Sequence, residues 1–123
     1  MPVLTDYAKN ILARALCGRA PALPTTIFLA LGSGGGAAGL TGEPVGNGYT
    51  RQRVTFTGTG QQRNVETVRF VFGAAAGNLT HIGLYDAATG GNALAYGLLA
   101  TTAAVSGPGT VTVPAEAVTV TGS

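Results

Sequence analysis

The sequence predicts a mainly β protein: an antiparallel β-sandwich, jelly-roll-like, with one short N-terminal helix. Helical periodicity occurs only near the N-terminus. The remainder divides into about seven or eight short strand-like stretches with turn signals every 8–12 residues or so, a pattern typical of sandwiches and barrels. At 123 residues the chain predicts a single domain, 1–123. Residues 1–18 would form an N-terminal arm and helix, and residues 25–121 the sandwich.

The predicted helix spans residues 5–16. Thr5 is a good N-cap, and Asp6 places a negative charge in the first turn, where the helix dipole favours it. Gly18 stands where a glycine commonly ends a helix. A helix of about three turns is marginal alone, so its apolar stripe is expected to pack on the sheet or on a neighbouring subunit. That stripe comprises Tyr7, Ile11, Leu12, Ala15 and Leu16.

The next two segments differ sharply in composition. Residues 25–31 are rich in β-branched and apolar side chains, which predicts a strand buried on both faces. Residues 32–48 contain eight glycines and no helical or strand period. We expect a Gly-rich surface loop here, and connections of this length are usually functional or mobile.

Two further strands are predicted on either side of a polar connection. In residues 49–56, Tyr49, Arg51 and Arg53 alternate with inward Val54 and Phe56, which indicates a half-exposed strand. Residues 65–72 form the second strand, with alternating apolar side chains directed inward: Val68, Phe70 and Phe72.

Residues 79–99 predict the central β-hairpin of the domain. Two apolar runs flank residues 86–92, a segment of turn formers that includes two adjacent glycines. Both faces of the hairpin are largely apolar, so we expect it to be covered on each side. Residues 110–113 and 117–121 would form a last pair of short strands, with a break at Pro114.

Composition narrows the classes of function. Charged residues make up 10% of the chain, well below the usual figure of about 25%. Such a chain suits a protein that stays attached to a larger assembly. The net charge of +2 is too small to indicate a nucleic-acid partner. We also expect no membrane span, because no apolar run approaches about 18 residues.

The cysteine content and the N-terminal residues indicate the compartment in which the protein is made. Cys17 is the single cysteine, so no internal disulfide forms, and its apolar neighbours predict a buried, inert thiol. The N-terminus does not resemble a signal peptide. The protein is therefore expected to be made, and to assemble, in a cytoplasm.

The sequence offers little for catalysis or for cofactors. His81 is the only histidine and is expected in the core or at an interface, and the five carboxylates are scattered. One histidine and one cysteine cannot make a typical metal site. The Gly-rich residues 32–39 have no following Gly-Lys-Ser/Thr, so a phosphate-binding loop is not expected. We expect no enzyme activity, no catalytic residues, no cofactor and no metal.

One polar surface remains as a candidate. Tyr49, Arg51 and Arg53 would share a strand face. This face could be a nucleic-acid footprint, but a solvated or interface face whose arginines meet carboxylates of a partner is favoured.

Several segments in order resemble a family of small bacteriophage virion proteins, of the tail fibre and head-decoration type. After the short helix come Pro-Thr-Thr-Ile-Phe-Leu-Ala-Leu (24–31) and, beyond the glycines, Gly-Asn-Gly-Tyr-Thr-Arg-Gln-Arg-Val-Thr-Phe (46–56). The most specific piece is Leu-Thr-His-Ile-Gly-Leu-Tyr-Asp-Ala-Ala-Thr-Gly-Gly-Asn (79–92). Residues 106–121 resemble the family's closing strands.

This resemblance implies a non-enzymatic component of the virion, assembled in the host cytoplasm. We expect a decoration (cement) protein on the capsid surface that contacts the major capsid protein, bridges neighbouring subunits and stabilises the shell, held by repeated weak contacts. A homo-oligomer, dimer or trimer, is expected. The candidate interface residues are Tyr7, Ile11, Tyr49, Arg51 and Arg53.

Two alternatives stay open. The chain could be an attachment or adaptor subunit for a tail fibre or head fibre, with tail or fibre proteins as partners. It could also be a carbohydrate-binding domain that recognises host glycans, although the lack of tryptophan counts against this.

Overall fold

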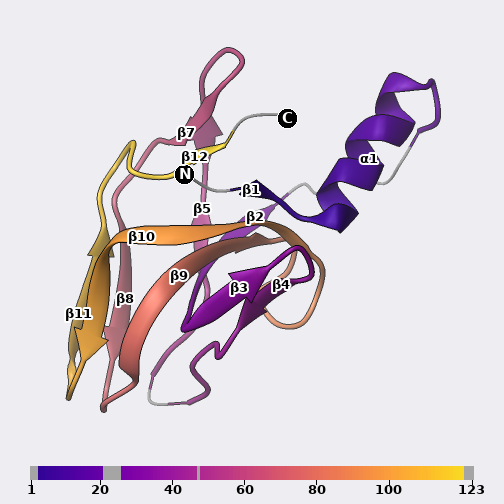
Figure 1. Cartoon of the computed structure of the whole chain (residues 1–123). Helices are drawn as coiled ribbons and strands as arrows, with labels where there is room; N and C mark the ends of the chain where they lie inside the picture. The colour runs from indigo at the N-terminus through magenta and orange to yellow at the C-terminus, as the bar shows by residue number, and fades with distance from the viewer. Residues whose placement is uncertain (1–2, 21–25, 47, 121–123) are drawn as a thin grey trace.

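The computed structural model describes residues 3–20, 26–46 and 48–120. They form a β body with one helix at its side (Figure 1). The mainly antiparallel β class with one N-terminal helix is thereby confirmed. In chain order the elements are β1 (Val3–Leu4), α1 (Asp6–Leu16), β2 (Ile27–Gly32), β3 (Gly34–Gly36), β4 (Gly39–Thr41), β5 (Gln52–Val54), β6 (Phe56–Thr57), β7 (Gln62–Asn64), β8 (Val68–Phe72), β9 (Gly77–Tyr85), β10 (Ala93–Val105), β11 (Gly109–Val113) and β12 (Thr119–Val120).

The largest sheet has the order β1-β10-β9-β2-β5, and all its pairs are antiparallel. Its centre is the β9–β10 hairpin, as predicted. In the connecting turn, the Asp86 carboxylate accepts a hydrogen bond from the Asn92 backbone N–H at 2.7 Å. Gly90 and Gly91 adopt φ values of 63° and 71°, which glycine reaches without steric cost.

The last two strands do not pair with each other, contrary to the expected closing pair. β11 pairs with β8, and β12 pairs with β7 in the three-stranded order β12-β7-β6. β7 lies within the segment expected to be a polar connection. Pro114 separates the two strands, so each joins a different sheet. A jelly-roll connectivity is not confirmed by this order.

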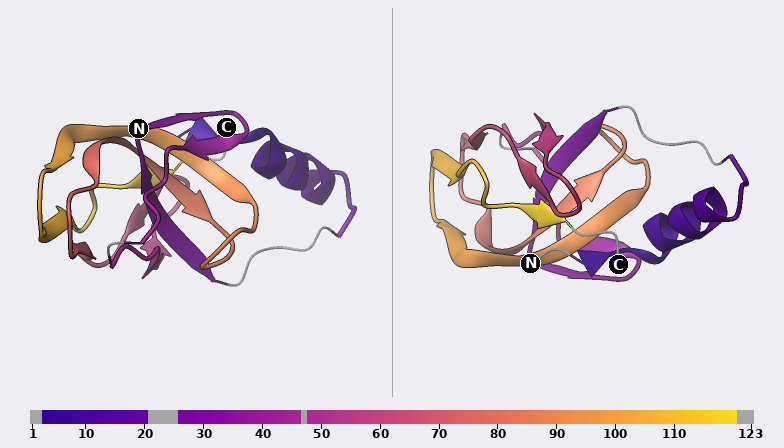
Figure 2. Two further views of the ribbon diagram at one scale, coloured as in Figure 1. Left: turned by 90° about the horizontal axis from the view of Figure 1, so that it is seen from below. Right: turned by 90° about the horizontal axis from the view of Figure 1, so that it is seen from above.

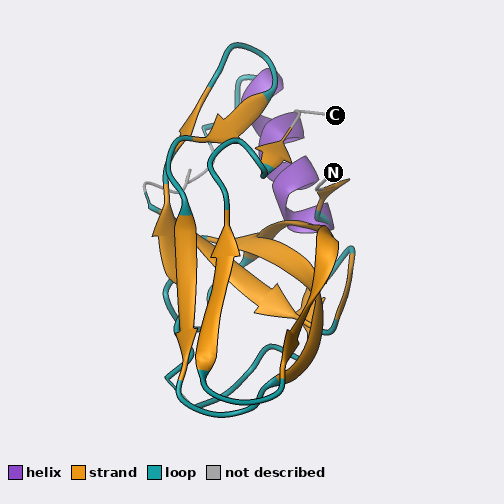
Figure 3. Cartoon of the chain, turned by 90° about the vertical axis from the view of Figure 1, so that its left-hand side faces the viewer, coloured by secondary structure: helices purple, strands orange, loops and turns teal. Residues whose placement is uncertain are grey.

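The main core lies between the central sheet and the smaller sheets (Figure 3). Along β8, Val68, Phe70 and Phe72 are buried while the residues between them are exposed, as the alternation predicted. The Tyr49 ring stacks on Phe70 and Phe72, with centroids 6.0 and 5.8 Å away. Tyr49 is therefore partly buried and packs against the core, and does not lie on the outer face of a half-exposed strand.

The other face of the central sheet is covered by a small hairpin, β3–β4. This hairpin occupies part of residues 32–48, where the sequence predicted an irregular loop. Its Leu40 packs on a second cluster that contains Ala30, Tyr85 and Ala93. The central hairpin is thus covered on both sides, as expected. The loop prediction failed because glycines obscure the period of a strand whose only apolar side chain is Leu40.

Gly83 permits the close approach of Leu40. A Cβ atom at position 83 would lie 2.7 Å from Leu40 Cγ and 2.9 Å from Cδ1. We expect Gly83→Ala to lower the free energy of unfolding by about 1–3 kcal/mol, because Leu40 and the hairpin must move outward. The measurement is urea unfolding followed by circular dichroism. Gly36→Ala is the control, because a Cβ at position 36 meets nothing within 4 Å. Equal stability of the two variants would contradict this account of the packing.

The helix begins and ends as predicted. The Thr5 hydroxyl accepts a hydrogen bond from Ala8 N–H at 3.3 Å and donates one to the Ala93 carbonyl at 2.6 Å. Gly18, just beyond the helix, adopts φ 75°. Among the described residues, no helix is long and apolar enough to span a membrane.

The far end of the helix departs from expectation. Of the predicted stripe, Ile11 is buried, but Tyr7, Leu12 and Leu16 are exposed, and Leu16 is 89% exposed. Cys17 was expected to be buried and is exposed. The reason is geometric: α1 lies against the body only near its N-terminal end and extends away from it (Figure 2).

Candidate functional site

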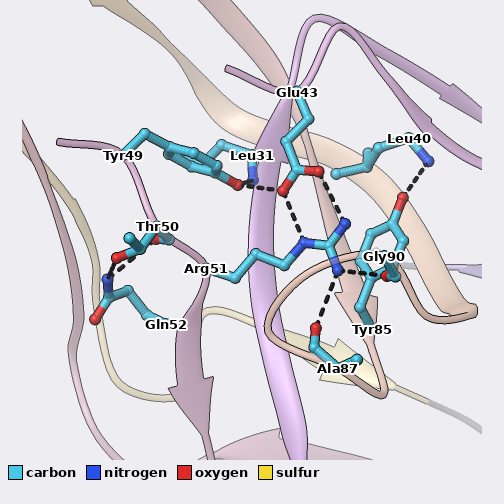
Figure 4. A network of polar contacts seen from close by, with 10 residues as sticks. All are labelled: Leu31, Leu40, Glu43, Tyr49, Thr50, Arg51, Gln52, Tyr85, Ala87 and Gly90. Carbon is cyan, nitrogen blue, oxygen red and sulfur yellow. Dashed lines mark hydrogen bonds and ion pairs between the residues drawn. The ribbon is translucent and has the colours of Figure 1, made fainter. Parts of the chain in front are cut away.

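The most densely bonded polar cluster is centred on Arg51 and Glu43 (Figure 4). Glu43 follows β4, and Arg51 directly precedes β5. The guanidinium grips the carboxylate with two hydrogen bonds, Nε to Oε2 at 2.8 Å and Nη2 to Oε1 at 2.9 Å. The Arg51 side chain is 7% exposed, so this ion pair is largely enclosed by protein.

The same guanidinium also holds the turn of the central hairpin. Its Nη1 donates to the carbonyl oxygens of Ala87 at 3.0 Å and Gly90 at 2.8 Å. Its central carbon lies 3.8 Å from the centre of the Tyr85 ring, a cation–π arrangement. Arg51 therefore connects three segments that are far apart in the sequence.

Two tyrosines extend the cluster into the sheet. Tyr49 donates its hydroxyl proton to Glu43 Oε2 at 2.7 Å and accepts a hydrogen bond from Leu31 N–H at 3.1 Å. Tyr85 accepts a hydrogen bond from Leu40 N–H at 3.0 Å. Tyr85 thus ties β4 to the central sheet, and Tyr49 joins Glu43 to Leu31 of β2.

The electrostatics fit a charged, closed cluster. Burial raises the pKa of Glu43, but hydrogen bonds from Arg51 and Tyr49 and the Arg51 charge outweigh it, so the pKa lies below its ordinary 4.5. The hydrogen bond with Glu43 raises the pKa of Arg51 against the effect of burial. Burial, followed by the bond to Glu43, raises the pKa of Tyr49 above its usual range.

Glu43 predicts an acid dependence of stability. Because its pKa is lower in the folded than in the unfolded chain, it stabilises the fold above the ordinary value of 4.5. This contribution is lost as the pH falls through the lowered pKa. We expect Glu43→Gln to be less stable than the parent at neutral pH and to lose less stability on acidification below 4.5, as measured by urea unfolding at a series of pH values. Parallel acid curves for the two proteins would contradict this assignment.

A cleft of about 340 Å³ lies beside the cluster, lined by residues 43–46 and 49–51 and by the 88–90 part of the turn. Arg51 lines this cleft but donates four hydrogen bonds to its own chain, out of five N–H groups. The cluster therefore acts as an internal clamp that fixes the two loops which form the cleft.

The structure separates the residues that the sequence grouped on one face. Tyr49 and Arg51 meet, but inside the protein, and the carboxylate that Arg51 meets is Glu43 of its own chain. Arg53 is exposed on β5, whereas the Arg51 side chain is largely enclosed. The expected shared face is therefore wrong in its geometry. An interface role for the five candidates, Tyr7, Ile11, Tyr49, Arg51 and Arg53, stays a prediction.

Sequence reasoning missed Glu43 because it lies in the segment expected to be a free loop. The one signal for it was compositional: Glu43 is the only charged residue between Arg19 and Arg51. A lone carboxylate in an apolar, Gly-rich stretch needs a cationic partner if the stretch folds onto the sheet.

Chemistry-bearing groups elsewhere are dispersed. Within residues 3–20, 26–46 and 48–120, no three His, Cys, Asp or Glu side chains gather as metal ligands would. His81 Nδ1 lies 2.8 Å from Thr80 Oγ1, and that hydroxyl donates to the Ser33 carbonyl at 2.9 Å. His81 thus helps to seat the β3–β4 hairpin.

Comparison with known proteins gives one family. The family model described as "Podophage GP4 fiber I protein gp80" matches residues 3–121. This match covers nearly the whole chain, including the helix, the central hairpin and both final strands. No curated protein matches the sequence.

Proposed function

Because the chain belongs to the family of the podophage GP4 fiber I protein gp80, and so is a structural protein of a bacteriophage virion, we propose that it is a small fibre subunit. In this role it attaches to other virion proteins and carries out no reaction. The observation that carries the proposal is the match over residues 3–121 to a family whose description names a fibre protein.

The structure supports an attached, non-catalytic subunit. In the Arg51–Glu43 cluster, the guanidinium of Arg51 pairs with Glu43 of the same chain and donates hydrogen bonds to the turn of the central hairpin. Such a cluster rigidifies loops and leaves the guanidinium little capacity to act on a substrate. A rigid β body with few free charges suits a part that is built into a particle.

A second candidate is a head-decoration protein that binds the major capsid protein. The shape favours it: the described residues form one β body with a single projecting helix, which suits a separate unit seated on a shell (Figure 1). Repetition of one weak attachment over a lattice would hold many copies by avidity.

Quantitative mass spectrometry of purified virions, with heads and tails separated, tests the proposal. A fibre subunit is expected in the tail or fibre fraction, in a low copy number set by the symmetry of its attachment point. Recovery with the heads, in proportion to the major capsid protein, would replace the fibre role with decoration. Absence from both fractions would overturn both candidates.

A further inference from the structure

Helix α1 is an arm that is joined to the β body at its base. At its base, Thr5 N–H donates to the Leu94 carbonyl at 3.0 Å, and Asp6 N–H donates to the Ala37 carbonyl at 3.1 Å. These bonds join the arm to β10 and to the turn of the β3–β4 hairpin. From there the helix extends away from the β body, as the two views of Figure 2 agree.

The outer half of the arm carries exposed apolar side chains. Leu12 and Leu16 are four residues apart and so lie on one side of the helix. They are 38% and 89% exposed, and Tyr7, nearer the base, is 39% exposed. The spacing of four residues between Leu12 and Leu16 is one with which an amphipathic helix fills a groove in another protein.

The arm also carries the whole net charge of the chain. Lys9, Arg14 and Arg19 outnumber Asp6 by two over residues 6–19. The remaining four arginines are balanced by four carboxylates, and the chain as a whole is +2. In the body, Arg51 pairs with Glu43 and Arg63 with Glu116.

These observations identify the chemistry of the partner. We propose that α1 docks, helix in groove, into an apolar groove rimmed by carboxylates on a different virion protein. The groove buries Leu12 and Leu16, and its acidic rim meets the exposed Lys9 and Arg19. The inference rests on the proposed function, since it names how the subunit is attached.

A second copy of the chain fits the arm less well. Two arms would bring like charges together, and the body of a second copy offers no excess of negative charge. The body does contain an apolar recess of about 220 Å³ lined by residues that include Leu4, Phe56 and Leu84. An arm seated there would form an oligomer without any other protein, so the oligomeric state must be measured as well.

The test is incorporation of variants into virions. The full chain is supplied in trans to a phage that lacks its own copy, and copies per purified particle are counted by mass spectrometry. Leu16→Ser and Lys9→Glu each change an exposed position of the arm. Each is expected to lower incorporation by about tenfold or more, because burial of a leucine or of an ion pair is lost at every site.

Two body variants serve as matched controls. Leu98→Ser replaces a leucine on β10 that is 67% exposed, and Arg69→Glu reverses an exposed charge on β8. Both are expected to incorporate like the parent. Circular dichroism of all four proteins checks that they fold, since a loss of incorporation counts only for folded variants.

The outcomes are distinct. Selective loss with the two arm variants, together with an unchanged oligomeric state in solution, supports the proposal. Normal incorporation of Leu16→Ser and Lys9→Glu overturns it while leaving the fibre role intact. Conversion of a parent oligomer to monomers by Leu16→Ser also overturns it, since the occupant would then be a second copy. Failure of the unmodified chain to enter particles would count against the proposed function itself.

Discussion

Replacement of Arg51 with methionine is expected to lower the free energy of unfolding by about 3 kcal/mol or more. The substitution leaves the Glu43 carboxylate, which is 25% exposed, without its cation. It also leaves the Ala87 and Gly90 carbonyls without their donor, and removes the cation–π contact with Tyr85. Urea unfolding followed by circular dichroism measures the effect.

The chain contains a control of the same chemistry. Arg63 and Glu116 form an ion pair of 2.9 Å whose side chains are 46% and 67% exposed. Solvent screens such a pair, so Arg63→Met is expected to cost less than about 1 kcal/mol. If the two substitutions cost the same, the clamp assigned to Arg51 does not exist.

Substitution of Asn64 by alanine is the second large effect, about 3 kcal/mol of lost stability. Asn64 is fully buried, and its amide makes three hydrogen bonds: Nδ2 to the Glu66 and Pro114 carbonyls at 2.8 and 3.0 Å, and Oδ1 from Val118 N–H at 2.8 Å. The backbone of residue 64 adds bonds to Val118 and Glu116. Alanine removes the acceptor of the buried Val118 N–H and the side-chain donor of the Glu66 carbonyl, while the Pro114 carbonyl keeps only its bond from Ala117 N–H.

The loss should be centred on the C-terminal segment, which gives a readout beyond global stability. In Asn64→Ala, amide hydrogen exchange at Glu116 and Val118 is expected to be much faster than in the parent. Asn78→Ala is the control, because Asn78 is exposed on β9 and its replacement leaves the C-terminal segment untouched. Unchanged exchange at Glu116 and Val118 in Asn64→Ala would contradict the role of Asn64.

The elements with strong local signals were predicted correctly. Thr5 and Gly18 bound the helix because capping depends on residues within one turn. The turn at 86–92 and the alternation along β8 are likewise readable, since each depends on a period of two or on residues that accept positive φ. The pairing of β11 with β8 and of β12 with β7 could not be read, because turn residues determine hairpins and not long-range partners.

The polar clusters around Arg51 and Asn64 could not be predicted from the sequence, because they also depend on long-range contacts. Glu43 and Arg51 are eight residues apart, and nothing local indicates that the chain between them folds so that they meet. Asn64 was placed in a polar connection, since a buried asparagine and an exposed one are identical in sequence. The helix α1 was predicted, but the exposure of Leu12 and Leu16 was not. Their exposure depends on how far the β body extends along the helix, which the sequence does not indicate.

The account depends most on the subunit being a fixed part of the particle, attached through α1. A reconstruction of the intact virion by electron cryo-microscopy tests this directly. The predicted result is density for the β body at each fibre attachment point, with α1 inserted into a neighbouring protein of different sequence. Particles whose density contains no such β body, or in which α1 faces solvent while another surface makes the contact, would contradict it.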